Sequence, residues 1–301
     1  MTMTRGTLSN LIVPGFRKVV FETYKERPIE GDKLVNTPSA GKRAYVEDFP
    51  VAGFGTLQSK AEGGAVAYQD AIQGAIKRYT WTSYGLGFRI TEEIYDDDLY
   101  GITGGKMSKA LGRSARNNKE IVMAAPYNNS FNTAFTGFEA SVSLCSVSHL
   151  QLRTGDTVTN RPASDADFSL LALQAAVEHF HGLEDESGIP LVMIPKMVAH
   201  SVGDYWLVNQ VLKSANLPGG NVNDMNQLSH EGIKPHLGHY FTDADAWWLI
   251  GDQHDVNYFE RKPFTFKNTD DFDTGDAKFK GTRRNGSGFG DWRGIYGTQG
   301  A

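Results

Sequence analysis

The amino-acid sequence predicts an α+β fold, in which helices and strands occupy separate stretches of the chain. Apolar residues recur at helical spacing over residues 106–125, 164–181 and 202–215. They alternate with other residues in the run 84–90, and short strand-like runs dominate the last third of the chain. Such segregation favours an α+β chain over a doubly wound sheet, in which helices and strands would alternate.

Composition limits the class of protein. The chain has 301 residues, 40% of them hydrophobic and 22% charged, so a core can form and a disordered or fibrous chain is excluded. A net charge of −5 argues against a dedicated nucleic-acid-binding protein, although a locally basic face remains allowed. The single cysteine, Cys145, excludes an intrachain disulfide and fits a reducing cytoplasm. No run approaches the roughly 18 apolar residues of a membrane span, so no membrane partner is expected.

Residues 1–43 are expected to form an extended N-terminal arm. Apolar residues from Leu8 to Tyr24 recur at helical spacing, but Pro14 and Gly15 lie among them, so a short, broken helix is predicted. Residues 25–42 are rich in proline, glycine, serine and charge, which is typical of an extended segment.

Residues 44–80 are expected to form a long hairpin. Strand-like runs at 44–54 and 76–90 flank a polar, glycine-rich tip at 55–70. A two-stranded ribbon of this length is marginal alone in water, so its tip is expected to contact another subunit. The residues expected at that contact are Gly55, Leu57, Lys60, Gly63, Gly64 and Tyr68.

A long helix is predicted from Lys106 to about Ala125, ended by Pro126. At about 100° per residue, its cations fall in one sector and its apolar residues on nearly the opposite one. The cations, called the basic face below, are Lys106, Lys109, Arg113 and Arg116. The apolar residues are Met107, Leu111, Ala115 and Val122. A basic helix face is ordinarily a solvated surface, but beside packaged DNA it would neutralise phosphates without reading bases.

The stretch 136–250 is expected to form a compact α/β lobe. Ser164 and Asp167 offer a capping-box-like start to a helix that runs through His181 and is closed by Gly182. A buried strand at 191–194, a helix at 202–215, a loop around 218–220 and short strands at 239–241 and 246–250 follow. Strand candidates at 257–261, 264–267 and 277–283 complete the chain.

Several side-chain patterns could carry chemistry, but each has a simpler structural interpretation. Cys145 and His149 could act as nucleophile and base, yet no third group can be assigned to orient them. The acidic residues of segment 92–98 lack the spacing of a calcium loop, and the run 101–106 lacks that of a phosphate loop. The best metal candidate is one loop with three imidazoles and a carboxylate: His230, Glu231, His236 and His239. Its spacing matches no helix-borne ligand pair, so no metal, cofactor or catalytic residue is predicted.

Four segments occur in a suggestive order: Phe88–Tyr100, Ala110–Arg116, Leu144–His149 and Asp291–Tyr296. The first two resemble the start of the spine helix in major capsid (head) proteins of tailed bacteriophages, particularly Mu-type head subunits with the Hong Kong 97 fold. The third resembles that family's Ser-x-x-His stretch, with Leu150 where a proline is expected, and the fourth its closing Asp-x-Arg-Gly segment.

The resemblance implies a Hong Kong 97-like capsid fold with five parts. They are an N-terminal arm at 1–43, an E-loop hairpin at 44–80, a P-domain with the spine helix at 81–135, an A-domain at 136–250, and C-terminal strands returning to the P-domain at 251–301. In such a fold the hairpin would contact a neighbouring subunit, and the basic face would look toward the lumen.

The resemblance also implies a structural, non-enzymatic protein of the virion. Copies would assemble into hexamers and pentamers in the host bacterial cytoplasm and close an icosahedral head around double-stranded DNA, which they bind without sequence preference. The expected partners are other copies, a portal and a decoration protein. No scaffolding extension precedes the arm in this sequence, so either a separate scaffolding protein directs assembly or such an extension was never part of the polypeptide. No lysine–asparagine crosslinking pair can be assigned, so noncovalent shell stability is expected.

Two other functions stay open at this point. An encapsulin-like nanocompartment would resemble the same fold but carry enzyme cargo. A metal-dependent hydrolase would use the loop with His230, Glu231, His236 and His239.

Overall fold

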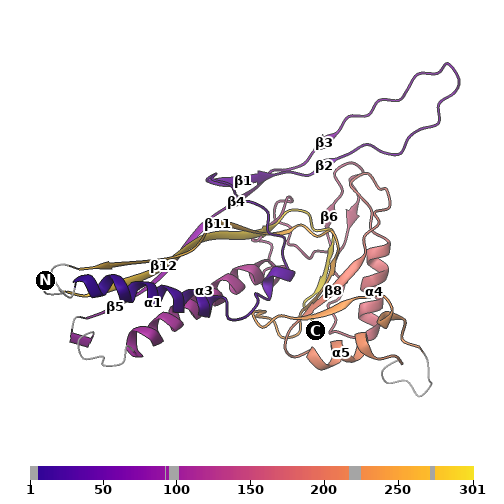
Figure 1. Cartoon of the computed structure of the whole chain (residues 1–301). Coiled ribbons are helices and arrows are strands. Elements are labelled where there is room, and N and C mark those ends of the chain that lie inside the picture. Colours follow the sequence, from indigo (N-terminus) through magenta and orange to yellow (C-terminus); the bar gives the residue numbers. More distant parts are fainter. Residues whose placement is uncertain (1–5, 92, 95–101, 217–224, 272–274) are drawn as a thin grey trace.

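The computed structural model describes residues 6–91, 93–94, 102–216, 225–271 and 275–301. Three parts are visible in Figure 1: an elongated layer of helices and sheet, a compact lobe, and a hairpin that projects away from both. The loop expected around 218–220, most of the acidic segment 92–98 and the end of the resemblance segment Phe88–Tyr100 lie outside the described residues.

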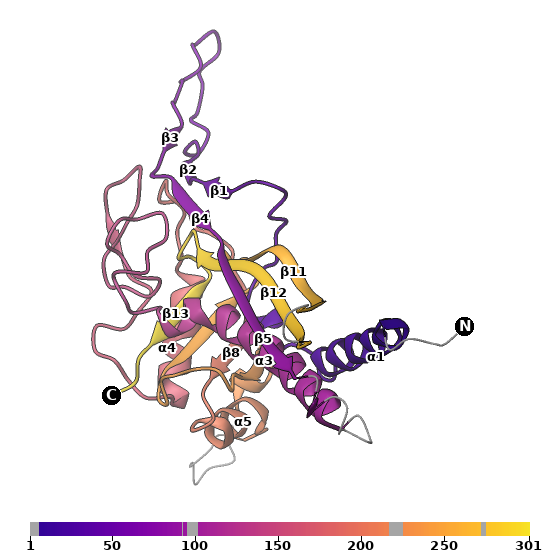
Figure 2. The same ribbon diagram turned by 90° about the vertical axis from the view of Figure 1, so that its left-hand side faces the viewer.

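The elongated layer packs two helices on a three-stranded antiparallel sheet. The helices are α1 (Gly6–Tyr24) and α3 (Ile102–Asn128). The sheet has the order β11 (Val256–Asp270), β12 (Ala277–Phe289) and β5 (Thr82–Ile90). Figure 2 shows β11, β12 and β5 side by side, and Figure 1 shows α1 lying along the strands. Apolar side chains of the helices, such as Val20 and Leu111, join Phe264 and Phe279 of the sheet in one buried cluster.

The N-terminal helix is continuous, so the predicted break at Pro14 and Gly15 is wrong. Close packing explains the continuity: a Cβ atom on Gly112 of α3 would lie 2.6 Å from the Val20 carbonyl oxygen, so the two helices touch backbone to backbone. Phe16 adds a T-shaped contact with Phe279, at 5.6 Å between ring centroids. Tertiary packing of this kind outweighs the cost of about 3 kcal/mol for a proline inside a helix.

Helix α3 begins four residues before the predicted start and includes Pro126 in its last turn. Tertiary hydrogen bonds hold that turn: Tyr127 Oη donates to the Leu34 carbonyl oxygen at 2.6 Å, and Asn128 Nδ2 to that of Tyr240 at 3.0 Å. The predicted apolar face is buried at Leu111, Ala115 and Val122. Met107, however, is exposed, so the buried face begins one turn later than predicted.

Two short ladders form the stem of the hairpin. Strand β1 (Tyr45–Asp48) pairs with β4 (Lys77–Thr80), and β2 (Val51–Ala52) pairs with β3 (Ile72–Gln73), both antiparallel. Residues 53–71 continue beyond them as the projecting part, visible at the top of Figures 1 and 2 and called the hairpin from here on.

A four-stranded mixed sheet forms the centre of the lobe. Its order is β13 (Ile295–Thr298), β10 (Trp247–Gly251), β8 (Pro195–His200) and β9 (Lys234–Leu237), with β8 and β9 parallel. Helices α4 (Leu170–His181) and α5 (Tyr205–Lys213) and the small ladder of β6 (His149–Leu150) and β7 (Thr157–Val158) complete it. Short 3-10 turns occur at η1 (Gly31–Lys33) and η2 (Gln227–Ser229). The central strand β10 is buried along its whole length, which makes it the middle of the main core.

Several predicted boundaries in the lobe are wrong because distant partners decide them. Helix α4 starts at Leu170, where the Ser169 side chain accepts a hydrogen bond from the Ala172 amide, and not at Ser164. The apolar run 191–194 precedes strand β8 and is not itself a strand, since the Ile194 amide donates to the Asp252 carboxylate at 3.1 Å.

The strands of the last third also differ from their predicted bounds. The edge strand is β9 at 234–237, whereas residues 239–241 form no strand. Residues 257–261 and 264–267 belong to one strand, β11, whose pairing with β12 shifts register on both sides of Lys262. Local bulges therefore gave the appearance of two short strands in the sequence.

Candidate assembly interface

The hairpin exposes apolar side chains that its own subunit does not cover. Every residue from Thr56 to Gln73 is exposed, and the relative exposure is 101% at Leu57 and 94% at Tyr68. All six residues expected at the contact lie in this hairpin: Gly55, Leu57, Lys60, Gly63, Gly64 and Tyr68. Clustered exposed apolar side chains of this kind mark interaction sites on soluble proteins.

Hydrogen bonds inside the hairpin define its shape. The Gly55 amide donates to Gln69 Oε1 at 2.8 Å, which ties the two strands together near the stem. At the tip the Gly64 amide donates to the Ala61 carbonyl oxygen at 2.9 Å, and Gly63 has a φ of +74°, which favours glycine. The hairpin is thus shaped internally, while its apolar side chains remain free for a partner.

The basic face is smaller than predicted. Lys106, Lys109 and Arg113 are exposed, and none of them forms an ion pair with another described residue. Arg116, by contrast, has a side chain only 16% exposed, and its Nη2 donates to the Pro28 carbonyl oxygen at 3.1 Å. It also lies 3.8 Å from Glu120, so it fastens the N-terminal arm to α3.

Glu120 completes the attachment of the arm. Its buried carboxylate accepts hydrogen bonds from the amides of Glu30 and Gly31, each at 2.9 Å. These amides lie at the start of η1, so the carboxylate caps that turn from 90 residues away in sequence. Arg116 and Glu120 therefore act inside the subunit, and three cations remain on the surface of the basic face.

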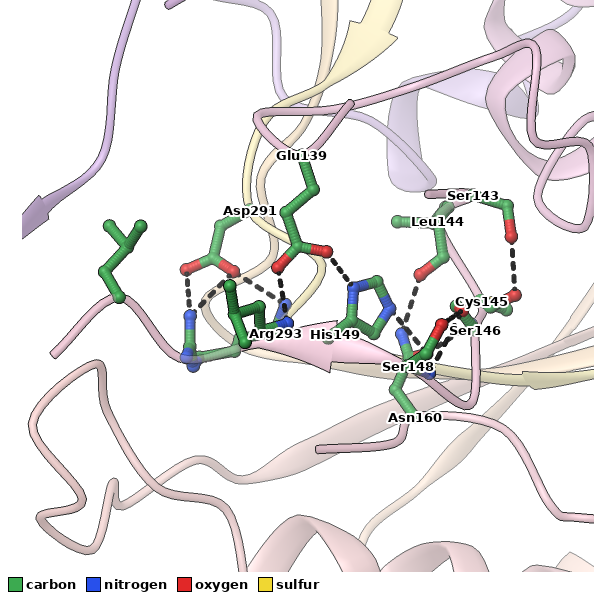
Figure 3. A network of polar contacts seen from close by, with 12 residues as sticks. Glu139, Ser143, Leu144, Cys145, Ser146, Ser148, His149, Asn160, Asp291 and Arg293 are labelled. Atoms are coloured by element: carbon green, nitrogen blue, oxygen red, sulfur yellow. Dashed lines mark hydrogen bonds and ion pairs between the residues drawn. The ribbon is translucent and has the colours of Figure 1, made fainter. Parts of the chain in front are cut away.

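Two of the resemblance segments meet in the fold, although about 140 residues separate them in sequence (Figure 3). The His149 ring stacks on Trp292, with 4.3 Å between ring centroids and 12° between planes. His149 Nδ1 lies 2.8 Å from Glu139 Oε2, and Nε2 lies 3.1 Å from Asn160 Oδ1. Because carboxylate, amide and indole engage the whole imidazole, His149 joins the lobe to the closing segment.

Arg293 extends this junction. Arg293 was recognised in the sequence only as one residue of the segment Asp291–Tyr296. Its guanidinium is 5% exposed, donates to Glu186 Oε1 at 2.7 Å and to the Glu184 carbonyl oxygen at 2.9 Å, and lies 3.2 Å from Asp291 Oδ1. The guanidinium carbon also lies 4.6 Å from the Trp292 ring centroid. Arg293 is a structural anchor with several charge-assisted bonds.

The geometry does not favour the nucleophile–base pair considered from the sequence. Cys145 is fully buried, and burial raises the pKa of its thiol, which keeps the sulfur protonated and unreactive. His149 meanwhile is held by Glu139 and Asn160. A buried structural cysteine is the simpler account.

The four residues of the best metal candidate do not come together in the structure. Within the described ranges, no three His, Cys, Asp or Glu side chains lie close enough together to hold a metal ion. His239 Nδ1 instead contacts the Glu30 carboxylate at 2.9 Å, and His236 is buried in β9. His230 and Glu231, which follow η2, therefore do not join them in a site.

The burial of His236 has a consequence for pH. Burial lowers the pKa of His236 to about 4, with Lys33 nearby as a second cause, against 6.5 when unfolded. The folded state then binds fewer protons between these two values, so stability should fall as the pH drops from 6.5 toward 4, by about 3 kcal/mol for this group. Urea unfolding of the unassembled subunit at pH 7 and pH 4.5 measures this loss. The variant His236→Leu should lose less stability over the same interval, and an equal loss in both proteins would contradict the account.

Among the described helices, none is both long and apolar enough to cross a membrane.

Comparisons with known proteins place this architecture. A family model described as "Phage capsid protein" matches residues 75–298. The procapsid protein of bacteriophage JBD30 is similar over 99% of this chain and 77% of its own, with a TM-score of 0.51 and 14% identity. The protein of the mature capsid of bacteriophage PhiM1 is similar over 89% of this chain and 86% of its own, with a TM-score of 0.59 and 10% identity. The protein of a virus-like particle from Pyrococcus furiosus is similar over 95% of this chain and 98% of its own, with a TM-score of 0.52 and 10% identity.

No curated protein sequence matches the chain. At identities this low the structural likenesses show the fold alone, and they confirm the predicted α+β capsid fold.

Proposed function

Because this chain belongs to the phage capsid protein family, we propose that copies of it form the hexamers and pentamers of an icosahedral head that encloses double-stranded DNA. The protein is a structural component of the phage capsid. The observation that carries the proposal furthest is the projecting hairpin, whose apolar side chains have no partner within the described part of the subunit. Burial of such side chains against neighbours, repeated over many copies, would stabilise a closed container.

The parts proposed for the subunit follow the resemblance. Residues 1–43 would be the arm, 44–80 the E-loop hairpin, 81–135 the P-domain, 136–250 the A-domain and 251–301 the returning strands. The Mu-type head subunits are proposed as relatives on the strength of the segments Phe88–Tyr100 and Ala110–Arg116, followed by Leu144–His149 and Asp291–Tyr296. The last two segments contact each other in the fold, which supports treating them as parts of one resemblance.

Further proposals concern partners and place of assembly. A separate scaffolding protein, a portal and a decoration protein are expected, with assembly in the host bacterial cytoplasm and noncovalent shell stability. A structural role needs no catalytic group, and the engaged state of His149 and the buried state of Cys145 agree with such a role.

The nature of the contents separates a head from a cargo-carrying nanocompartment. Particles purified from the cells in which they form should contain double-stranded DNA that resists nuclease until the particles are disrupted. Particles that instead carry a stoichiometric enzyme and no protected DNA would favour the encapsulin-like alternative. Bound zinc together with hydrolysis would be needed to restore the hydrolase alternative.

The exposed part of the basic face is proposed to look toward the DNA. The double variant Lys109→Gln with Arg113→Gln should reduce the slope of log binding constant against log salt by about 2, one for each lost phosphate contact. The measurement is DNA binding by dissociated capsomers over a range of salt concentrations.

A matched control lies on the opposite side of the layer. Lys267 and Lys280 are exposed partners across β11 and β12, and each follows a buried phenylalanine that faces α3, so they point away from that helix. The variant Lys267→Gln with Lys280→Gln should leave the salt slope unchanged. A reduced slope in this control, with no change in the α3 variant, would assign the lumen to the sheet side.

A further inference from the structure

We infer that Arg153 is a positioning residue that fixes the direction in which the hairpin leaves the subunit. Its Nη2 donates to the Gly53 carbonyl oxygen at 2.7 Å and to the Asp70 carbonyl oxygen at 2.6 Å. These carbonyls belong to the two opposite sides of the hairpin, just beyond the last β2–β3 pair. One guanidinium on the lobe therefore holds both sides of the hairpin. The inference rests on the proposed role of the hairpin in contacting a neighbour.

The inner end of the stem is packed on the subunit: Tyr79 of β4 is buried against Phe259, and Lys77 Nζ donates to the Thr136 carbonyl oxygen. The outer end is less covered, since Val51 of β2 and Ile72 of β3 are exposed. A cavity of about 270 Å³ lies beneath it, with Pro50 and Ala75 of the stem on one side and Leu152 and Trp292 of the body on another. Beside this cavity the stem touches the lobe, where Gly74 lies against Leu152, so the cavity removes only part of the packing that would resist a tilt of the outer stem. Besides Arg153, the Ser187 hydroxyl reaches the Gly53 carbonyl oxygen, but only at 3.5 Å.

The lobe holds Arg153 itself in a fixed place. The Arg153 amide donates to the Glu186 carbonyl oxygen at 3.2 Å, and the preceding amide of Leu152 donates to Glu186 Oε2 at 2.6 Å. The other oxygen of that carboxylate receives the bond from Arg293 at 2.7 Å. A continuous line of hydrogen bonds thus runs from the stem through Arg153 and Glu186 to the buried Arg293. Because these bonds hold Arg153 in place, its guanidinium can fix the direction of the hairpin relative to the lobe.

The chemistry of the clamp calls for arginine. Hydrogen bonds from a cation to carbonyl oxygens are shorter and stronger than neutral ones, and the planar guanidinium is preorganised, so it loses less freedom than an ammonium on forming them. Lysine keeps the charge but lacks that geometry. A free hairpin would sample many directions, and only some would meet a neighbour, so the loss of the clamp should slow assembly more than it affects folding.

The first test is hydrogen exchange of the full-length unassembled subunit. In Arg153→Ala the amides of Gly55 and Gly74, which are hydrogen bonded within the hairpin and stem, should exchange about tenfold faster, the effect of losing one charge-assisted bond. The exposed Lys196→Ala removes a charge from β8 and serves as the control, with unchanged exchange. Arg153→Lys should fall between the wild type and Arg153→Ala. Unchanged exchange in Arg153→Ala would overturn the inference.

The second readout is the rate at which the same proteins form shells, followed by light scattering. Arg153→Ala should assemble about tenfold more slowly than the wild type, with partial recovery in Arg153→Lys. Faster exchange together with an unchanged assembly rate would overturn the positioning role. A deletion of residues 56–68 separates the two ideas: if the deletion abolishes shells and Arg153→Ala does not slow them, the positioning inference fails alone. If the deletion also leaves shells intact, the proposed role of the hairpin fails.

Discussion

A subunit that lacks residues 56–68, with two glycines joining Gly55 to Gln69, should remain folded and form no closed shells. The deleted residues are all exposed, so the deletion removes no buried contact within the subunit. It does remove Leu57 and Tyr68, whose exposed side chains would contribute about 1.5–3 kcal/mol each on full burial in an interface. Because each subunit in a shell repeats the contact, the loss multiplies over the whole particle.

Matched point variants make the same test without a deletion. Leu57→Ala with Tyr68→Ala should reduce the yield of shells strongly, whereas Lys60→Ala, an exposed polar change in the same hairpin, should reduce it little. Electron microscopy reports the shells, and thermal unfolding of the subunits checks that the fold is intact. Normal shells from the deleted subunit would show that the hairpin is not an assembly contact.

The second large effect is expected at Arg293. The variant Arg293→Met should lower the free energy of unfolding by about 3 kcal/mol, because it leaves the mostly buried Glu186 carboxylate without its cation and the Glu184 carbonyl oxygen without its donor. Urea unfolding of the unassembled subunit measures the change.

Arg89→Met is the matched control. The Arg89 side chain is 72% exposed and lies 3.9 Å from Asp276, so its loss should cost less than about 1 kcal/mol. Similar effects of the two substitutions would mean that the junction around Arg293 contributes no more than an ordinary surface ion pair.

The parts of the fold that sequence predicts well are those with strong local periodicity. The alternating run 84–90 became β5 and the periodic segment after Lys106 became most of α3. The boundaries failed where a distant residue decides them. Asp252 ends the apolar run at Ile194, and Tyr127 reaches Leu34 to hold the turn beyond Pro126. Such partners have no signature in the local sequence.

In the candidate interface, too, the sequence predicts some features and not others. The hairpin could be predicted because a long ribbon without a covering layer has a sequence pattern of its own. The inward position of Arg116 could not be predicted, because its acceptor, the Pro28 carbonyl oxygen, is 88 residues away in sequence. Arg153 had no signal at all, since its acceptors are backbone carbonyls that any sequence provides. His149 and Trp292 lay in recognised segments, but only the fold brings them together.

The measurement that tests the central claim most directly is electron microscopy of the purified protein, expressed with and without its neighbouring open reading frames, together with mass determination by size-exclusion chromatography. Closed shells, rings of five or six subunits, or tubes are the expected result. A small monomer that persists under both conditions would contradict the assembly function.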